Sequence, residues 1–444
     1  MTDDTAGGTS GSGKWLSTRE TADRLGVKSE TVYAYVSRGL LTSRRAPGGR
    51  GSTFDPDEVD ALARRSGRGR LGGDSAAADR PAGSPGGDGR WDGTLTARTG
   101  ITLIGTDRYY YRGVDACALA ARYGYEETAA WLWTGELTPG IRFTAPHESL
   151  AAARRAVAAL PAHSGLVDRL RAATIAAAVT DPLRFDLSAP TVLAAAPALI
   201  ATLVGALPAR ETDAADTPDG SAESDASGSA LAARLWPRLS RHTADQASVR
   251  VLDAALTLLI DHDLAASTLA ARVAASARAH PYAVVSAGLG AVDGPLHGAA
   301  SGLAHRLLTE VLERGSAAAV VADHLREGRR IPGLGHRLYP GEDPRARMLF
   351  GLLDELPRAA PALAAAREVV ETTARYTPLH ANVDLALAVL SVSAGMPAEA
   401  GETVFAVART AGWIAHALEE YQERPLRLRP SGHYTGPTPP QPLP

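Results

Sequence analysis

The segment from Thr191 to Leu207 constrains the fold most, because it has the spacing of a helix but almost no polar side chain. A helix that is apolar all round must be surrounded by other elements, so 192–204 is predicted to be a core helix. Apolar residues at three-to-four spacing or all round also occur in 115–137, 151–160, 251–260, 303–312, 361–375 and 383–390. Strand signals are confined to 100–104 and 109–112, a candidate hairpin. The sequence therefore predicts a mainly all-α fold with site residues at helix ends and loops.

The bulk properties narrow the class of protein. At 444 residues the chain exceeds one ordinary domain, and its formal charge of −3 predicts no general attraction to polyanions. Cys117 is the only cysteine, which excludes an intramolecular disulfide framework or a cysteine-rich zinc site and suits a reducing compartment. No run approaches the roughly 18 apolar residues of a membrane span. The first 13 residues are polar and unlike a signal peptide. We therefore expect a cytoplasmic protein.

Composition also indicates where the chain divides. We expect residues 1–13 to be disordered, 14–70 to form a small module, 71–90 to be a flexible linker, 91–436 to form a large helical domain, and 437–444 to be a proline-rich tail. Inside the large domain, 209–230 is acidic and rich in Ser and Gly, which predicts a disordered loop. A smaller helical subdomain is expected over roughly 305–410. Gly8–Lys14 fits most of a phosphate loop, but Trp15 replaces the required Ser or Thr.

The module at 14–70 has the signals of three short helices. Ser17–Glu20 is a candidate capping box for a helix carrying Leu25, and Ser29 is a candidate cap for a second helix. Asp55 precedes Pro56 and predicts the start of a third. Helix, tight turn, helix, basic loop and helix resembles a winged helix-turn-helix of the MerR or excisionase type.

That resemblance implies DNA binding. The module has twelve basic and seven acidic side chains, a local net charge of +5. The candidate DNA contacts are Lys28, Ser29, Thr31 and Arg38 in a major groove, with Arg44, Arg45 and Arg50 on phosphates or in a minor groove. The alternative is a small solvated module that docks on protein or on its own enzyme domain.

Chemistry-bearing residues concentrate between Gly294 and Arg345. His297 precedes a glycine and His336 follows one, and Arg345 comes nine positions after His336. An Asn-Val-Asp384 cluster follows 48 residues beyond His336. Two imidazoles, a carboxylate and an arginine suit removal of a proton next to a carbonyl, with the developing oxyanion held by hydrogen bonds.

Further motifs follow one another in order along 91–436. They are 111–115, 131–137, 261–263, 266–268 with Arg272, the two histidine motifs, Asp343–Arg345, Asn382–Asp384, 408–416, and 428–430 with 434–436. This ordered set resembles the citrate synthase family. The resemblance implies a large helical domain with a smaller one. It also implies condensation of acetyl-CoA with oxaloacetate and water to give citrate and CoA, an acyl transfer that enters the tricarboxylic acid cycle. Acetyl-CoA is then a substrate, and no cofactor or metal is expected.

The same resemblance implies a role for each site residue. Asp384 would take the methyl proton of acetyl-CoA, His297 would hold the thioester oxygen, and His336 would polarise the ketone of oxaloacetate and protonate it. The carboxylates would be clamped by His262, Arg345, Arg409 and Arg429. The residue matching Arg429 reaches in from the partner subunit, which implies a homodimer.

Several alternatives stay open. Asp384 also has the position of a helix N-cap, and His297 that of a structural histidine. Asp261–Asp263 invites a metal interpretation, but neighbouring side chains on a helix point apart. The sequence departs from the family at Ala299–Ser301, Ala265, Ser431 and the Leu-His-Ala before Asn382. These departures leave room for a 2-methylcitrate synthase that uses propionyl-CoA. A separate alternative is a DNA-binding regulator whose synthase-like domain senses a metabolite, although the presence of His297, His336, Asp384 and the three clamp arginines argues against it.

Overall fold

The computed structural model describes residues 15–25, 27, 32, 35–36, 41–45, 52–65, 98–210, 228–294, 297–428 and 435–438. It divides into two compact units, 1–89 and 90–444. Several predicted features lie outside the described residues: the linker at 71–90, most of the acidic loop and the tail, and the candidate contacts Lys28, Ser29, Thr31, Arg38, Arg50 and Arg429.

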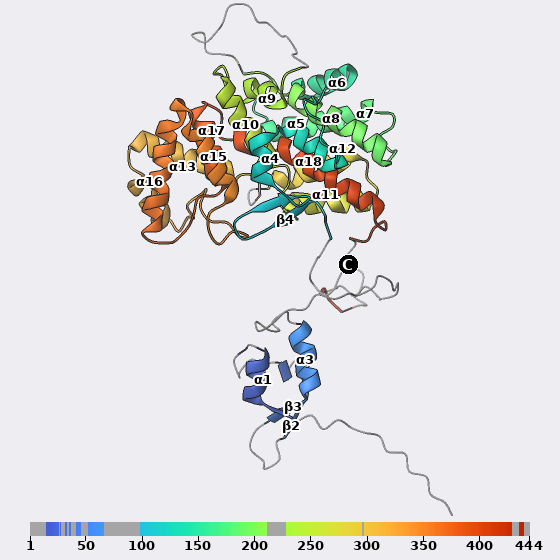
Figure 1. Ribbon diagram of the computed structural model, residues 1–444, viewed down its shortest axis with the longest axis vertical. Coiled ribbons are helices and arrows are strands. Elements are labelled where there is room, and N and C mark those ends of the chain that lie inside the picture. The colour runs from blue at the N-terminus through green and yellow to red at the C-terminus, as the bar shows by residue number, and fades with distance from the viewer. Residues whose placement is uncertain are drawn as a thin grey trace, which may run out of the picture. The chain divides into compact units, whose positions relative to one another are not determined.

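The first unit combines two described helices with a small antiparallel sheet (Figure 1). Its elements are β1 (Leu16–Ser17), α1 (Thr18–Leu25), β2 (Ser43–Arg45), β3 (Ser52–Phe54) and α3 (Pro56–Arg65), with strand order β1-β3-β2. The side chains of Leu25, Val32, Phe54 and Val59 form its core. Strands β2 and β3 pair with each other on the two sides of the basic loop, whose central residues are not described.

Local capping explains where its helices begin. The Ser17 backbone N–H donates to Glu20 Oε2 at 2.8 Å, and the Glu20 N–H donates to Ser17 Oγ at 3.3 Å, which confirms the capping box. Asp55 Oδ1 accepts from the Asp57 N–H at 2.9 Å, so Asp55 caps α3 as predicted. Arg24 and Asp60 form an ion pair at 2.6 Å that joins α1 to α3.

The second unit opens with a small antiparallel sheet of β4 (Thr102–Ile104), β5 (Tyr109–Tyr111) and β6 (Val114–Asp115). The first two strands confirm the predicted hairpin, and the third was not predicted. Tyr109 and Tyr111 turn their rings into the core. The Tyr109 hydroxyl donates to the Leu258 carbonyl at 2.9 Å, so the sheet is tied to the end of a helix that precedes His262.

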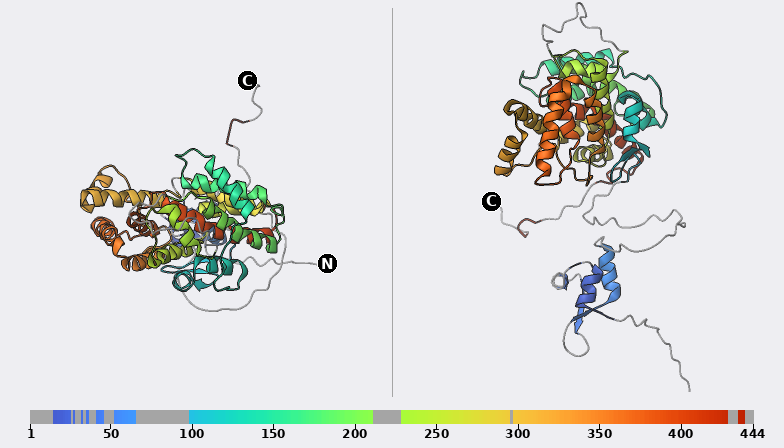
Figure 2. Two further views of the ribbon diagram at one scale, coloured as in Figure 1. Left: turned by 90° about the horizontal axis from the view of Figure 1, so that it is seen from above. Right: turned by 60° about the vertical axis from the view of Figure 1, so that its left-hand side comes forward.

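The rest of this unit is helical, which confirms the predicted fold class (Figures 1 and 2). The helices are α4 (Ala116–Arg122), α5 (Tyr125–Thr134), α6 (His147–Ala158), α7 (Leu166–Thr180), α8 (Ala189–Ala206), α9 (Leu231–Leu239), α10 (Gln246–Leu258), α11 (Ala266–Ser276), α12 (Pro281–Val292), α13 (Ala300–Arg314), α14 (Ala317–Arg326), α15 (Pro344–Asp354), the 3-10 turn η1 (Pro357–Ala359), α16 (Ala360–Ala374), α17 (Val383–Ser393) and α18 (Ala400–Gln422). The long helix α18 runs through the middle of the unit and packs on α11, α12, α8 and α5.

Two groups of helices meet at the site. Helices α13 to α17 pack mainly on one another and gather on one side of the unit in Figure 1. Helices α11 and α12 pack on each other and on α18. The loops and first turns that join these groups carry most of the predicted site residues, but Arg409 lies in the middle of α18, which corrects the expectation that all of them lie at helix ends and loops.

The predicted helix at 115–137 is two helices, because the chain breaks at Tyr123 and Gly124. Gly124 adopts an extended backbone, and its N–H donates to Glu127 Oε2 at 2.9 Å to start α5. Seven helices were missed altogether: α7, α9, α11, α12, α14, α15 and α18. Several of them, such as α18, are alanine-rich and buried nearly all round, so they lack a clear polar face in the sequence.

Helix α8 corrects the expectation that no apolar run is long enough for a membrane span. Ala189–Ala206 has 18 residues, and by length and composition alone it could cross a membrane. Its buried residues pack on α6, α7, α9 and α18, with Ile200 and Leu203 completely enclosed. The helix is therefore the predicted core helix of the fold.

Candidate active site

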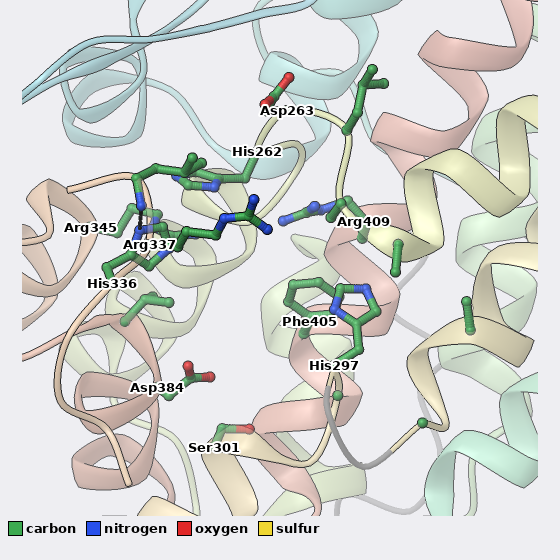
Figure 3. Close-up of a pocket in the computed structure, with 18 of the residues that line it drawn as sticks. His262, Asp263, His297, Ser301, His336, Arg337, Arg345, Asp384, Phe405 and Arg409 are labelled. Carbon is green, nitrogen blue, oxygen red and sulfur yellow. Dashed lines mark hydrogen bonds between the residues drawn. The ribbon is translucent and has the colours of Figure 1, made fainter. Parts of the chain in front are cut away.

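A cavity of about 970 Å³ brings together six of the seven residues predicted for catalysis and substrate binding. These are His262, His297, His336, Arg345, Asp384 and Arg409. They come from the α10–α11 loop, the turn before α13, the α14–α15 loop, and the helices α15, α17 and α18. Figure 3 shows Asp384 and His336 facing the open centre from one side, and His297 and Arg409 from the other. The seventh residue, Arg429, is outside the described residues.

Asn382, and not Asp384, is the N-cap of α17. Its Oδ1 accepts from the backbone N–H of Asp384 at 3.0 Å, while its Nδ2 donates to the Gly335 carbonyl at 2.9 Å. The Asn382 N–H also donates to the Gly333 carbonyl at 2.9 Å. Capping by the neighbour leaves the Asp384 side chain to face the cavity. Gly333 and Gly335, which precede His336, have positive φ values of 81° and 78°, conformations that favour glycine.

The environment of Asp384 suits a base. Burial raises the pKa of its carboxyl to about 6, against the opposing effect of the Arg345 charge. Within the described residues, no hydrogen bond to its carboxylate oxygens is recorded. A carboxylate that is poorly solvated and unpaired is a stronger base than one in water.

His336 and Arg345 direct hydrogen-bond donors into one region. The Leu338 N–H donates to His336 Nδ1 at 3.1 Å, which places the proton of the neutral ring on Nε2. That Nε2 lies 3.2 Å from a terminal nitrogen of Arg345. The guanidinium can only donate, so this second contact is a hydrogen bond only in the other tautomer, with the proton on Nδ1. Burial and the Arg345 charge lower the pKa of His336 to about 4, so the ring is neutral at pH 7. In the tautomer with the proton on Nε2, two donors face one region, and an acceptor such as a carbonyl or carboxylate oxygen bound beside them would satisfy both.

Asp343 orients Arg345. Its Oδ1 accepts from Arg345 Nε at 3.0 Å and its Oδ2 from a terminal guanidinium nitrogen at 2.8 Å. Asp343 also caps α15, because Oδ1 accepts from the Arg345 N–H at 3.0 Å. Both side chains are almost completely buried, and the pair therefore has a fixed geometry.

His297 is held by Ser267 at the start of α11. Its Nε2 lies 2.8 Å from Ser267 Oγ and accepts from the Ser267 N–H at 3.4 Å. An accepting Nε2 places the proton of the neutral ring on Nδ1. The ring also packs edge-on against Phe405, with centroids 5.5 Å apart. Burial, together with the Arg409 charge, lowers the pKa of His297.

Arg409 has donors left over. Its Nε donates to the Leu259 carbonyl at 2.8 Å, and its guanidinium lies 4.5 Å from the Phe405 ring centroid. One terminal nitrogen is buried and has no hydrogen-bond partner among the described residues. Burial, with the charge of Arg345 adding to it, lowers the pKa of Arg409. An unpaired buried cation on a cavity wall is costly unless an anion binds there.

Asp261–Asp263 lies in the loop between α10 and α11, so the expected helical placement is wrong. Asp261 is buried and contacts His416 Nε2 at 3.2 Å and Thr102 Oγ1 at 2.5 Å. His262 turns to the cavity and contacts the Tyr339 hydroxyl at 2.8 Å. Its pKa is lowered well below the usual value by burial and by Arg345, so His262 is neutral. No cluster of three metal-ligating side chains occurs in the described parts of the chain.

Sequence reasoning missed Ser267, Phe405 and Tyr339 as parts of the site and gave Asp343 no role. Asp343 precedes Pro344 in the pattern of a helix N-cap, which was a usable signal. Ser267 and Phe405 lie in helices that meet the site only through tertiary packing. In the first unit, the exposed Arg44 lies 4.6 Å over the Trp15 ring, a contact that no sequence pattern indicated.

Comparison with known proteins identifies the family. Residues 90–431 match the model of the citrate synthase C-terminal domain. The chain belongs to the citrate synthase family. Residues 15–67 match a helix-turn-helix domain, which confirms the resemblance of the first unit.

Individual relatives agree with this assignment. A citrate synthase of Haloferax volcanii is 30% identical over 366 residues, covering 78% of this chain and 94% of the relative. Putative citrate synthase 2 of Mycobacterium tuberculosis is 37% identical over 203 residues, or 45% of this chain and 54% of the relative. The matches thus span about half the length of several curated relatives.

Solved citrate synthase structures share the fold. The enzyme of Thermotoga maritima has a TM-score of 0.62 at 26% identity, covering 79% of this chain and 96% of that one. A ternary complex of Thermoplasma acidophilum citrate synthase with carboxymethyl coenzyme A and oxaloacetate has a TM-score of 0.64 at 23% identity, covering 78% and 96%.

Proposed function

We propose that this chain is a citrate synthase that condenses acetyl-CoA with oxaloacetate and water to give citrate and CoA. The observation that carries the proposal is the single cavity lined by His297, His336 and Asp384. The carboxylate of Asp384 removes a proton from the methyl group of acetyl-CoA. The electron pair of that C–H bond moves towards the thioester oxygen, which accepts a hydrogen bond from His297 Nδ1–H.

The second half of the reaction uses the hydrogen-bond donors of His336, Arg345 and Arg409. The enolate carbon of acetyl-CoA attacks the ketone carbon of oxaloacetate, and the ketone oxygen takes the proton of His336 Nε2–H as it becomes an alcohol. The proton gained by Asp384 passes to solvent, and His336 is protonated again from solvent. His336 Nε2–H and Arg345 point at one region and suit the ketone oxygen and the adjacent carboxylate. Arg409 has an unpaired donor for the other carboxylate. Water then hydrolyses the citryl thioester to citrate and CoA. The reaction uses acetyl-CoA as a substrate and needs no separate cofactor.

A thiol-release assay tests this function. The full chain is mixed with oxaloacetate and either acetyl-CoA or propionyl-CoA, and free CoA is followed with a thiol reagent. We expect release with acetyl-CoA at least tenfold faster in kcat/KM. Preference for propionyl-CoA would instead identify a 2-methylcitrate synthase. Release from neither donor, with oxaloacetate still raising the melting temperature, would identify a metabolite-sensing regulator.

We further propose that the enzyme is a cytoplasmic homodimer. Helix α7 and the loop after it expose large apolar side chains: Ile175, Val179, Leu183 and Phe185. Ile175 and Val179 are one helical turn apart, so they share a face that a second copy would cover. In such a dimer Arg429 would reach the partner's cavity. Sedimentation velocity should give a dimer for the full chain and a monomer for the Ile175→Asp, Val179→Asp double variant.

A second proposed function, DNA binding, belongs to the first unit. The helix-turn-helix match and the local charge of +5 support it. Arg44 on β2 is exposed, beside the basic loop that leads to β3. Binding through phosphates releases counterions, so affinity should fall steeply with added salt. Salt-independent association, or none with any duplex, would favour docking on protein.

A further inference from the structure

Tyr339 contacts two of the cavity's histidines although it does not line the cavity. Its hydroxyl lies 2.8 Å from His262 Nε2. Its ring lies over the His336 ring, with centroids 4.8 Å apart and planes inclined by 31°. The side chain is only 2% exposed. Because Tyr339 is absent from the cavity wall, any influence on a ligand must pass through these histidines.

The hydrogen bond between Tyr339 and His262 has one consistent direction. Burial raises the pKa of the Tyr339 hydroxyl, which is therefore protonated at neutral pH. Among the described residues, His262 Nε2 is the atom within hydrogen-bond distance of this hydroxyl, and either of the two could donate. A buried hydroxyl proton needs an acceptor, so the hydroxyl donates to Nε2. The neutral His262 ring then carries its own proton on Nδ1 and keeps that nitrogen as its donor.

The ring of Tyr339 has a separate effect on His336. Both residues belong to the α14–α15 loop, where the Leu338 N–H already donates to His336 Nδ1. That hydrogen bond fixes one edge of the imidazole, and the plane of the ring depends on what packs against its faces. The tyrosine ring covers one face of the imidazole and limits the tilt of its plane, so Nε2–H stays directed beside Arg345.

We propose that Tyr339 is a positioning residue for the oxoacid substrate, which fixes the tautomer of His262 through its hydroxyl and the ring plane of His336 through its aromatic face. The proposal rests on the function proposed above. It assigns His262 Nδ1–H, rather than Nε2–H, as the donor to a carboxylate of oxaloacetate.

Two variants separate the two contacts. Tyr339→Phe keeps the ring and removes the hydroxyl, so a mixture of His262 tautomers should appear. We expect KM for oxaloacetate to rise about tenfold, the effect of one lost hydrogen bond, with kcat changed less than about threefold. Tyr339→Leu also removes the ring, so kcat should fall about tenfold or more as well.

The tautomer has a direct readout. In protein labelled with ¹⁵N-histidine, long-range ¹H–¹⁵N spectra distinguish a protonated ring nitrogen from an unprotonated one. The His262 signals are assigned by their loss in His262→Gln. The wild type should show a protonated Nδ1 and an unprotonated Nε2, and Tyr339→Phe should show averaged shifts at both.

Tyr109→Phe is the matched control. The Tyr109 ring also contacts the His262 ring, with centroids 5.5 Å apart, but its hydroxyl donates to the Leu258 carbonyl. This variant should leave both the His262 shifts and KM near wild type. Equal effects of Tyr109→Phe and Tyr339→Phe would overturn the proposal, as would unchanged His262 shifts in Tyr339→Phe.

The tautomer measurement also separates this inference from the proposed function. It is made on the free enzyme and does not need turnover. A wild type that releases no CoA but shows the expected His262 shifts contradicts the citrate synthase activity alone. A wild type with full activity and a protonated Nε2 on His262 contradicts the role of Tyr339 alone.

Discussion

Asp343 accepts a hydrogen bond from the backbone N–H of Val383 at 3.0 Å, across 40 residues of sequence. The same oxygen accepts from the guanidinium of Arg345 at 2.8 Å. Asp343 therefore joins the start of α15 to the start of α17, where Asp384 follows Val383. One buried carboxylate thus fixes the separation between the proposed anion-binding arginine and the proposed base.

Removing this carboxylate should affect both stability and binding. We expect Asp343→Asn to lower the free energy of unfolding by about 3 kcal/mol, because it leaves Arg345 buried without its counter-charge. KM for oxaloacetate should rise as well. Denaturant titration measures the first effect. Asp354→Asn is the control, since its ion pair with Arg367 is exposed and should contribute under about 1 kcal/mol. Equal losses in the two variants would contradict the structural role of Asp343.

Asp384→Asn should remove the base without removing a binding group. We expect kcat to fall about a thousandfold or more. Oxaloacetate binding, measured by calorimetry, should stay within about threefold of wild type. Turnover near the wild-type level would show that another group takes the proton.

The raised pKa of Asp384 makes two predictions about pH. The base must be ionised, so kcat/KM should fall as pH drops below about 6. The folded pKa also exceeds the ordinary value for aspartate, about 3.9, so ionisation opposes folding. This cost is absent below pH 4, grows between pH 4 and 6, and is complete above that. Asp384→Asn should therefore be more stable than wild type at pH 7, by up to about 3 kcal/mol, and equally stable at pH 4.

Arg409→Gln should weaken oxaloacetate binding because the unpaired donor and its charge are lost. We expect KM to rise about a hundredfold, the effect of losing a charge-assisted pair. Oxaloacetate at millimolar concentration should raise the melting temperature of the wild type by several degrees, and not that of the variant. A retained thermal shift would place the anion elsewhere.

Deletion of residues 1–90 should leave condensation within about twofold of the full chain, because contacts cluster within 90–444 and within 1–89 as separate units. The deletion should abolish DNA binding. Within the full chain, Arg44→Ala should weaken binding and reduce its salt dependence, since one phosphate contact is lost. Lost turnover on deletion would show that the module is integral to the enzyme.

The sequence predicted the parts of the fold that follow from local patterns. The apolar segment around Ile200 gave a core helix, and the Ser17–Glu20 and Asp55 signals gave helix starts. Helix α18 was missed because 17 of its residues are buried, among them Arg409 and His416. A helix enclosed by others shows no periodic polar face, so its presence is decided by tertiary packing.

For the candidate site, too, some features could be predicted from the sequence and others could not. Glycine-flanked His336 and the Asn382–Asp384 cluster were visible as motifs, and the structure places them on one cavity. Their protonation states were not visible. The neutral ring of His336 depends on burial and on Arg345, while its tautomer depends on the Leu338 N–H at one ring nitrogen and on Arg345 at the other. Such effects come from three-dimensional neighbours that spacing does not encode.

Asn382 is the chain's single asparagine. Its three hydrogen bonds to Gly333, Gly335 and Asp384 connect the His336 loop to the first turn of α17. Asn382 therefore ties the loop that carries the proposed ketone-binding donor to the helix turn that carries the proposed base. Loss of this one side chain should disturb the spacing of both groups at once.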